Sequence, residues 1–379
     1  MVKHVNQNHA VRCFDVQALR DRHPDTSDAS PKHVIPTEIA VAYGGRRVRK
    51  LVDVLCLPTG SGSAEILPQH ERARCMRYLL GVLTDQEAKA EAVGCDVAVP
   101  LANTLRGEKE SGENKTLACK LLQSLAHSLE GRNSIVAIDA VVAASALLKD
   151  DDVNVRIGAG EFLASMAKHN DGAVATLRAA EGNVLVLLAN AAVEESPAAT
   201  CGAKTLCCEI LALLTTTDEG TVAALKANTV TAMKKVFQSD SASEIPNGVF
   251  LKTAAARCLK NVCQHGVGKI KALEMGVVPL ILPLLRSRDT DVRLQATGAL
   301  ACLTIENDAK IEVVNNSARF DLCALLRDSH KSVAENALVT LQQCAEHPSA
   351  RKLIRECVSK RDHALVFDRR VVGESVVTF

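Results

Sequence analysis

A unit of about 41 residues that occurs twice near the end of the chain constrains the fold more than any other feature. Val292 aligns with Val333, and Leu300 aligns with Leu341, each pair 41 residues apart. The residues between them keep the same apolar and polar order. Because one unit of this size cannot bury its apolar face alone, consecutive units must stack and share one core.

The same unit can be traced back along the chain by one leucine in each copy. The spacing between these leucines is 41 or 42 residues in four places and 48 residues in two. Residues 239–249 lie in one of the two longer units, and a longer surface link costs roughly a few tenths of a kcal/mol in closure entropy. The seven anchor leucines are Leu80, Leu122, Leu163, Leu211, Leu259, Leu300 and Leu341.

Each unit reads as three helices. A first helix ends at Gly276, where glycine takes the left-handed conformation without steric cost. A second helix, residues 277–285, is apolar on nearly every face, as in a buried helix. A polar link then ends in Asp291, or in Asn154 in the earlier copy, either of which can cap the third helix. The third helix carries alanines and leucines at i, i+3 and i+4 spacing.

A repeat of about 40 residues with this content is typical of armadillo and HEAT proteins. Three helices per unit, the first one short, favour the armadillo form over the two-helix HEAT form. We therefore expect an all-α fold: a right-handed armadillo/HEAT-type α-solenoid superhelix of about seven repeats with flexible terminal arms. Its parts are a disordered or partner-bound arm at 1–34, the solenoid at 35–358 and a tail at 359–379, with residues 347–358 as a C-terminal cap. The tail is expected to be disordered; an added strand on a partner is the alternative.

Composition narrows the partners. The net charge of +1 provides no global field for nucleic acid or acidic membranes, and no apolar run reaches the ~20 residues of a membrane span. Fourteen cysteines without a signal peptide predict free thiols in a reducing compartment. The absence of Trp predicts an aliphatic core. The basic run at 46–50 reads as a solvated helix face, with a contact to an acidic partner left open.

No pattern in the sequence carries catalytic chemistry. Cys207 and Cys208 are adjacent, so their side chains diverge on a helix and cannot share a zinc ion. Cys263 and His265 could act as nucleophile and base, but the end of a helix and its turn explain them more simply. The Gly-rich segment 59–63 lacks the Lys-Ser/Thr of a phosphate loop. We expect no enzyme activity, no cofactor, no metal and no small-molecule substrate.

The candidate binding residues come from the armadillo geometry, in which the third helices line a concave groove. The positions two residues before and two after each anchor should face that groove. Importin-like proteins place Trp before and Asn after the anchor, and here only Asn261 fits. A catenin-like binder would show a continuous basic groove, whereas these charges alternate in sign, so we expect one particular protein segment of mixed charge or a packed helix. The groove positions are Lys120, Ser124, Glu161, Ser165, Glu209, Leu213, Arg257, Asn261, Gly298, Cys302, Val339 and Gln343.

Two short motifs resemble one known family. Residues Pro36–Gly44 resemble the P-T-x-x-A-x-A-Y-G motif, and Pro348–Ile354 the P-x-x-R-K-L-L motif, of the radial spoke head 14 homologue family of armadillo proteins in motile cilia. The resemblance covers roughly residues 35–358. It implies a structural subunit of the axonemal radial spoke, in its stalk or neck, that binds other radial spoke proteins. It carries over no catalytic residue.

Two hypotheses follow. The first is a non-catalytic protein-interaction scaffold of the radial spoke, located in the cytoplasm and cytoskeleton, in the axoneme of the cilium or flagellum. The second is a soluble cytoplasmic armadillo-repeat adaptor in trafficking or signalling. An enzyme hidden in the terminal arms would require an activity that is lost when residues 1–34 and 359–379 are deleted.

Overall fold

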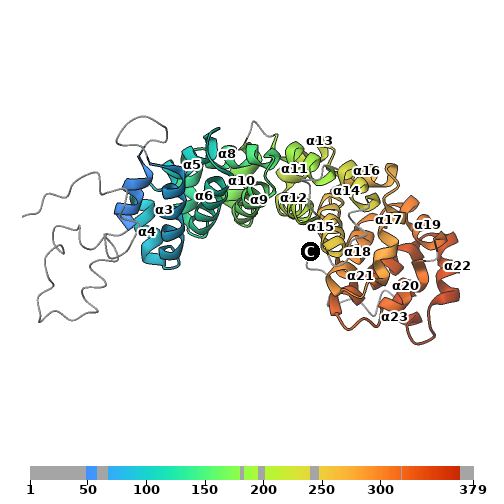
Figure 1. Ribbon diagram of the computed structural model, residues 1–379. Helices are drawn as coiled ribbons and strands as arrows, with labels where there is room; N and C mark the ends of the chain where they lie inside the picture. Colours follow the sequence, from blue (N-terminus) through green and yellow to red (C-terminus); the bar gives the residue numbers. More distant parts are fainter. Residues whose placement is uncertain are drawn as a thin grey trace, which may run out of the picture. The chain divides into compact units, whose positions relative to one another are not determined.

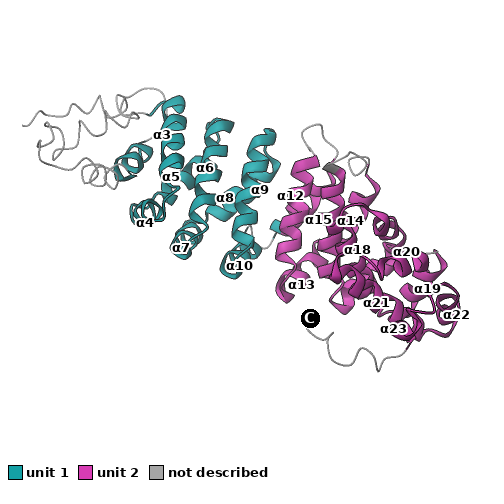
Figure 2. Ribbon diagram, turned by 90° about the horizontal axis from the view of Figure 1, so that it is seen from below, with its two compact units in different colours: residues 1–184 teal, residues 185–379 magenta. Residues whose placement is uncertain are grey.

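The computed structural model describes residues 48–57, 67–179, 183–194, 201–239, 247–316 and 318–367, which are helices joined by turns with no strand among them. The chain divides into two compact units, residues 1–184 and 185–379, shown in teal and magenta in Figure 2. The expected N-terminal arm, the Gly-rich segment 59–63, the motif Pro36–Gly44 and the tail after residue 367 lie outside the described residues.

Unit 1 starts, within the described part, with a helix over residues 48–55, which buries a stripe formed by Val48, Leu51, Val52 and Leu55. The third helices α3, α6 and α9 lie side by side (Figure 2). The labelled helices of unit 1 are α3 (Gln69–Val82), α4 (Gln86–Gly94), α5 (Ala98–Arg106), α6 (Gly112–Leu125), α7 (Leu129–Ala137), α8 (Ala140–Ala146), η2 (Leu147–Lys149), α9 (Val153–Ala167) and α10 (Asn170–Arg178).

Unit 2 continues the same order of helices. Its third helices α12, α15, α18 and α21 pack against one another in sequence (Figure 1). The helices from the division onwards are α11 (Val184–Val193), α12 (Cys201–Leu214), α13 (Asp218–Lys226), α14 (Thr229–Gln238), α15 (Asn247–Val262), α16 (Gly266–Glu274), α17 (Val278–Ile281), η5 (Leu282–Arg286), α18 (Thr290–Leu303), α19 (Asn307–Asn315), α20 (Ala318–Leu325), α21 (Lys331–Glu346), α22 (Pro348–Cys357) and α23 (His363–Phe367).

The three-helix repeat is confirmed. The first helices α4, α7, α10, α13, α16 and α19 each have 9 residues, whereas the third helices have 14 to 16. No single described helix is long and apolar enough to cross a membrane. The two segments Leu129–Ala137 and Ala140–Lys149 reach the length and apolar composition of a membrane span only when they are counted together. The chain bends by 72° between them.

The anchor leucines form the centre of each layer, with one correction. Leu122, Leu163, Leu211, Leu259 and Leu300 are fully buried, and Leu341 is 1 % exposed. The seventh anchor is Leu79, which is fully buried, whereas Leu80 is half-buried. The spacing between the first two anchors is therefore 43 residues, because the link before α6 is one residue longer than the alignment assumed.

Gly276, between α16 and α17, has φ +63, which confirms the expected left-handed turn. Asp96, Asp139 and Asn228 take the same conformation, with φ of 53 to 55, between the first and second helices of other layers. Asp and Asn are the side chains that tolerate this region best after glycine. The turn therefore repeats although its residue type does not.

The residue that caps the third helix lies two positions earlier in the link than expected. Asp289 Oδ1 accepts hydrogen bonds from the backbone N–H groups of Asp291 at 2.9 Å and Val292 at 3.2 Å. In the same way Asp152 Oδ1 accepts from the N–H of Asn154 at 2.8 Å. The expected second helix at 277–285 is interrupted: α17 gives way to the 3₁₀ segment η5, where Pro283 lacks the N–H that an α-helix would use.

Four glycines lie where a third helix meets the next first helix. Each is the third residue of its first helix, and an added Cβ would lie 1.8–2.3 Å from a carbonyl oxygen of the preceding third helix. No side chain fits at such a distance. These close approaches are made by Gly131, Gly172, Gly220 and Gly268.

A cation lies seven residues before six of the seven anchors, a regularity that the sequence analysis missed. Three of these cations reach an acidic side chain in the link of the next repeat. Lys115 Nζ lies 3.1 Å from Asp150, and Arg293 Nε lies 2.7 Å from Asp328 Oδ2. Arg72 Nε lies 3.8 Å from Glu110. The six cations are Arg72, Lys115, Arg156, Lys204, Lys252 and Arg293.

The C-terminal end of unit 2 is closed by two helices. The expected cap helix is α22. The short helix α23 packs on α21, although it lies in the segment expected to be a disordered tail. Gln342 Nε2 on α21 donates to the carbonyl of Leu365 at 2.8 Å, and Val366 is 3 % exposed. Arg327 Nη2 also reaches Asp362 Oδ2, before α23, at 3.0 Å. The last third helix is therefore covered by the chain's own residues.

Candidate peptide-binding face of the third helices

The third-helix face is the solvent-exposed edge that the stacked third helices present within each unit. The residue two before each anchor lies on it. In unit 1 Lys120 is exposed and Glu161 is half-buried. In unit 2 Glu209, Arg257 and Val339 are half-buried, whereas Gly298 is buried and is the exception in this series. The structure therefore brings these predicted residues together as a row within each unit.

The residues two after the anchors tie neighbouring third helices together. Ser124 Oγ donates to the carbonyl of Leu83 at 3.3 Å. Asn261 Nδ2 donates to the carbonyl of Ala212 at 2.8 Å, so its amide is already engaged by the protein. Ser165 is 4 % exposed, while Leu213 and Cys302 are half-buried.

The last residue of this series makes a similar contact. Gln343 Oε1 accepts a hydrogen bond from the hydroxyl of Thr304 at 2.6 Å. Thr304 and Leu83 both lie four residues after an anchor, so Gln343 and Ser124 contact equivalent positions, although Ser124 donates its hydrogen bond and Gln343 accepts one. This second series contributes to the cohesion of the stack, whereas the first series faces solvent.

The charges on the face differ between layers. In unit 1 Arg77 forms an exposed ion pair with Glu113 of the next layer. In unit 2 Lys260 lies across Gly298, where an added Cβ would be 2.9 Å from Lys260 Cδ. Burial lowers the pKa of the Lys260 ammonium, and the neighbouring Arg257 acts in the same direction.

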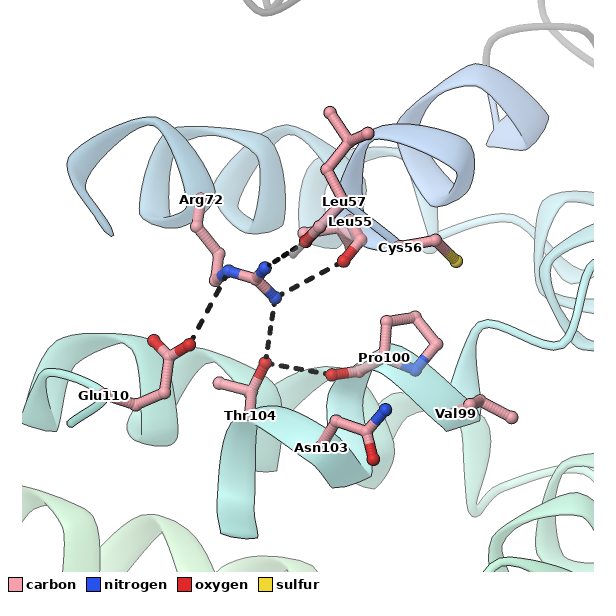
Figure 3. Close-up of a pocket in the computed structure, with 9 residues that line it drawn as sticks. All are labelled: Leu55, Cys56, Leu57, Arg72, Val99, Pro100, Asn103, Thr104 and Glu110. Atoms are coloured by element: carbon pink, nitrogen blue, oxygen red, sulfur yellow. Dashed lines mark hydrogen bonds and ion pairs between the residues drawn. The ribbon is translucent and has the colours of Figure 1, made fainter. Parts of the chain in front are cut away.

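A cavity of about 430 Å³ lies at the start of unit 1, lined by residues of helix 48–55, α3, α5 and the link before α6 (Figure 3). Arg72 crosses it and donates from Nη2 to the carbonyl of Leu57 at 2.8 Å and from Nη1 to that of Leu55 at 3.3 Å. A further bond from Nη1 reaches Thr104 Oγ1 at 3.4 Å. Arg72 therefore satisfies carbonyls at the end of helix 48–55, as helix termini require.

The possible nucleophile and base, Cys263 and His265, have different surroundings. Cys263 is fully buried, and burial raises the pKa of its thiol. His265 Nε2 instead lies 3.1 Å from Asp218 Oδ1. In the part of the chain that the structure describes, no group of three or more His, Cys, Asp or Glu side chains could hold a metal ion.

Fold and face together define an armadillo-type helical-repeat protein. Residues 268–304, which include most of α16 and all of α17 and α18, match the family model described as "Armadillo/beta-catenin-like repeat". No curated protein sequence matches the chain. Proteins with this fold are generally protein-interaction scaffolds.

Solved structures show the same fold. An engineered protein is similar with a TM-score of 0.68 and 21% identity over 82% of this chain and 71% of that chain. A designed armadillo repeat protein in complex with the peptide (KR)4 is similar with a TM-score of 0.54 and 19% identity over 64% of this chain and 98% of that chain. At such identities the likeness concerns the fold alone.

Proposed function

We propose that this protein is a non-catalytic scaffold whose third-helix face binds extended segments of other polypeptides. The observation that carries the proposal is the row of side chains two residues before the anchors, held at the solvent edge of successive third helices in each unit. The structurally similar designed armadillo repeat protein was solved with a bound peptide. Binding through many layers gives a large contact area without a conspicuous pocket.

The cellular setting is part of the proposal and comes from the sequence resemblance. The motif Pro348–Ile354 lies in α22, the cap helix of unit 2, which is consistent with a motif that marks the end of the repeats. We infer a structural subunit of the ciliary or flagellar axoneme, in the stalk or neck of the radial spoke, with other radial spoke proteins as partners. Nucleic acid, membranes and small-molecule substrates are not part of this function.

The cellular experiment is localisation and co-purification from ciliated cells. A tagged protein should be found in axonemes, and radial spoke proteins should elute with it when axonemes are extracted with salt. A protein spread through the cytoplasm and absent from axonemes would end the spoke assignment. If vesicle proteins or kinases co-purify and spoke proteins do not, the result would support the soluble adaptor instead. The protein would still be a protein-interaction scaffold.

The binding face is tested by a matched pair of variants. Reversing the charge of Lys120, Glu161 and Glu209 on the third-helix face should remove the co-purified partners. Reversing Lys226 and Lys235, which are exposed on α13 and α14, should leave them bound. Loss of partners in the second variant alone would contradict the assignment of the face.

A further inference from the structure

The third helix α15 differs from its neighbours in unit 2 by presenting two cations on the third-helix face. Arg257 lies two residues before its anchor and Lys260 one residue after it, so they are at i and i+3 and share one side of the helix. At these two positions α12 has Glu209 and Ala212, α18 has Gly298 and Ala301, and α21 has Val339 and Gln342, without any cation.

Within the described part of the chain, these two cations have no acidic partner. In the described residues, neither Arg257 nor Lys260 forms an ion pair with a carboxylate, in contrast to Arg293 and Arg327, which both do. Glu209, one layer away, is the acidic residue of the same series, and it makes no ion pair with Arg257. Two adjacent positive charges on one helix face repel each other, and a bound anion would relieve that repulsion.

Lys260 also acts on a thiol of the next third helix. Cys302 on α18 has a thiol whose pKa is raised by burial, while the ammonium groups of Lys260 and Lys269 act in the opposite direction. Gly298 of α18 is buried, with the Lys260 side chain across it, so the stem of Lys260 lies at the edge between α15 and α18.

We propose that Arg257 and Lys260 form a site on the third-helix face of unit 2 for the Asp or Glu carboxylates of an extended acidic segment of a partner protein. The proposal rests on the proposed function, because it assumes that this face binds polypeptide. Charge complementarity selects the occupant: Arg and Lys donate charge-assisted hydrogen bonds to carboxylates, and an extended chain places alternate side chains on one side. A basic peptide such as (KR)4 would be repelled here.

The test uses the full chain and two labelled peptides, (Gly-Glu)4 and (Gly-Lys)4, with binding followed by fluorescence anisotropy at low salt. We expect the acidic peptide to bind about tenfold more tightly than the basic one. The double variant Arg257→Met/Lys260→Met, which keeps side-chain length, should weaken acidic-peptide binding about tenfold. The control Lys226→Met/Lys235→Met loses the same net charge from α13 and α14 and should change binding less than about twofold.

Two further measurements keep the test decisive. The first is thermal unfolding, which shows whether both variants are folded. The second is peptide binding by the wild type in about 0.5 M salt, which should weaken binding of the acidic peptide. Arg257→Glu/Lys260→Glu should reverse the preference to (Gly-Lys)4. Equal weakening in the control variant, or tighter binding of a single-stranded oligonucleotide than of (Gly-Glu)4, would overturn the proposal.

Co-purification separates this proposal from the scaffold function. If Arg257→Met/Lys260→Met retains the natural partners while the charge reversals at Lys120, Glu161 and Glu209 release them, the acidic site is wrong and the scaffold stands. If none of these variants releases any partner, the third-helix face is not the binding surface and both proposals are wrong.

Discussion

Arg293 on α18 holds Asp328, in the link before α21, through two hydrogen bonds, from Nε to Oδ2 at 2.7 Å and from Nη2 to Oδ1 at 3.1 Å. The two side chains are 13 % and 6 % exposed and lie 35 residues apart in the sequence. Arg293 Nη1 also donates to the carbonyl of Ser287 at 2.9 Å. One arginine therefore joins its own link to the next one, which makes the stacking of layers dependent on single side chains.

Arg293→Met should destabilise unit 2 by about 2 kcal/mol, because Asp328 is left buried without its charged partner. Chemical denaturation followed by circular dichroism measures the change. The control is Lys331→Met, whose pair with Glu335 is exposed, and we expect a change below about 0.5 kcal/mol. Adding Asp328→Leu to Arg293→Met should recover part of the loss; no recovery would show that the pair is not the cause.

Acid should weaken unit 2. The hydrogen bond from Arg293 lowers the pKa of Asp328, and hydrogen bonds from Ser359 and then Arg327 lower that of Asp362. A carboxyl group whose pKa is lower in the folded state stabilises the fold fully above its unfolded pKa, about 3.9, and loses that contribution as pH falls through the folded pKa.

The stability of the wild type should therefore decline as pH falls below about 4. The urea midpoint measured between neutral pH and about pH 3 follows this change. Asp328→Asn should have a flatter profile than the wild type. A variant with the same slope as the wild type would show that Asp328 does not contribute.

Gly220→Ala should destabilise the corner between α12 and α13 by about 2 kcal/mol, because the added Cβ would lie 1.8 Å from the carbonyl oxygen of Leu214. The matched control is Gly202→Ala in α12, where an added Cβ meets nothing within 4 Å and alanine favours the helix. We expect the control to be neutral or slightly stabilising in thermal unfolding. Equal losses in both variants would contradict the close approach as the cause.

Thiol labelling should follow burial. Among the described cysteines Cys56 is exposed, whereas Cys119 and Cys258 are buried and burial raises the pKa of each of these two thiols to about 12. Because the thiolate is the reactive form, iodoacetamide should modify Cys56 first and the two buried thiols only after unfolding. Peptide mass spectrometry over time measures the rates, with the urea-denatured protein as reference. Native labelling of Cys119 as fast as Cys56 would disprove the buried placement.

The sequence predicted the layers because apolar periodicity is a direct consequence of burial. Six anchors were placed correctly, and the error at Leu80 arose because the link before α6 is one residue longer than the alignment allowed. Gly276 identified one left-handed turn, but the same turn at Asp139 and Asn228 was missed because neither residue type demands that conformation. Helix α23 has 5 residues, too few for any periodic pattern.

The candidate site was predicted less completely than the fold. The positions before the anchors could be placed from helix geometry, and they lie on the third-helix face. The sequence could not predict the hydrogen bond from Asn261 to the carbonyl of Ala212, because this bond depends on the distance between two third helices. The repeated cation at Lys115 and Arg293 had a visible signal in the same alignment: a basic residue lies seven positions before six of the seven anchors.

The packing of α23 on α21 has a consequence for assembly. A stack of identical layers whose last surface is left bare would accept the first layer of another molecule and grow into a fibre. Here Gln342 is bonded to Leu365 and Val366 is buried, so the final layer of this chain is occupied from within. We therefore expect this covered layer to disfavour head-to-tail stacking of one molecule on another.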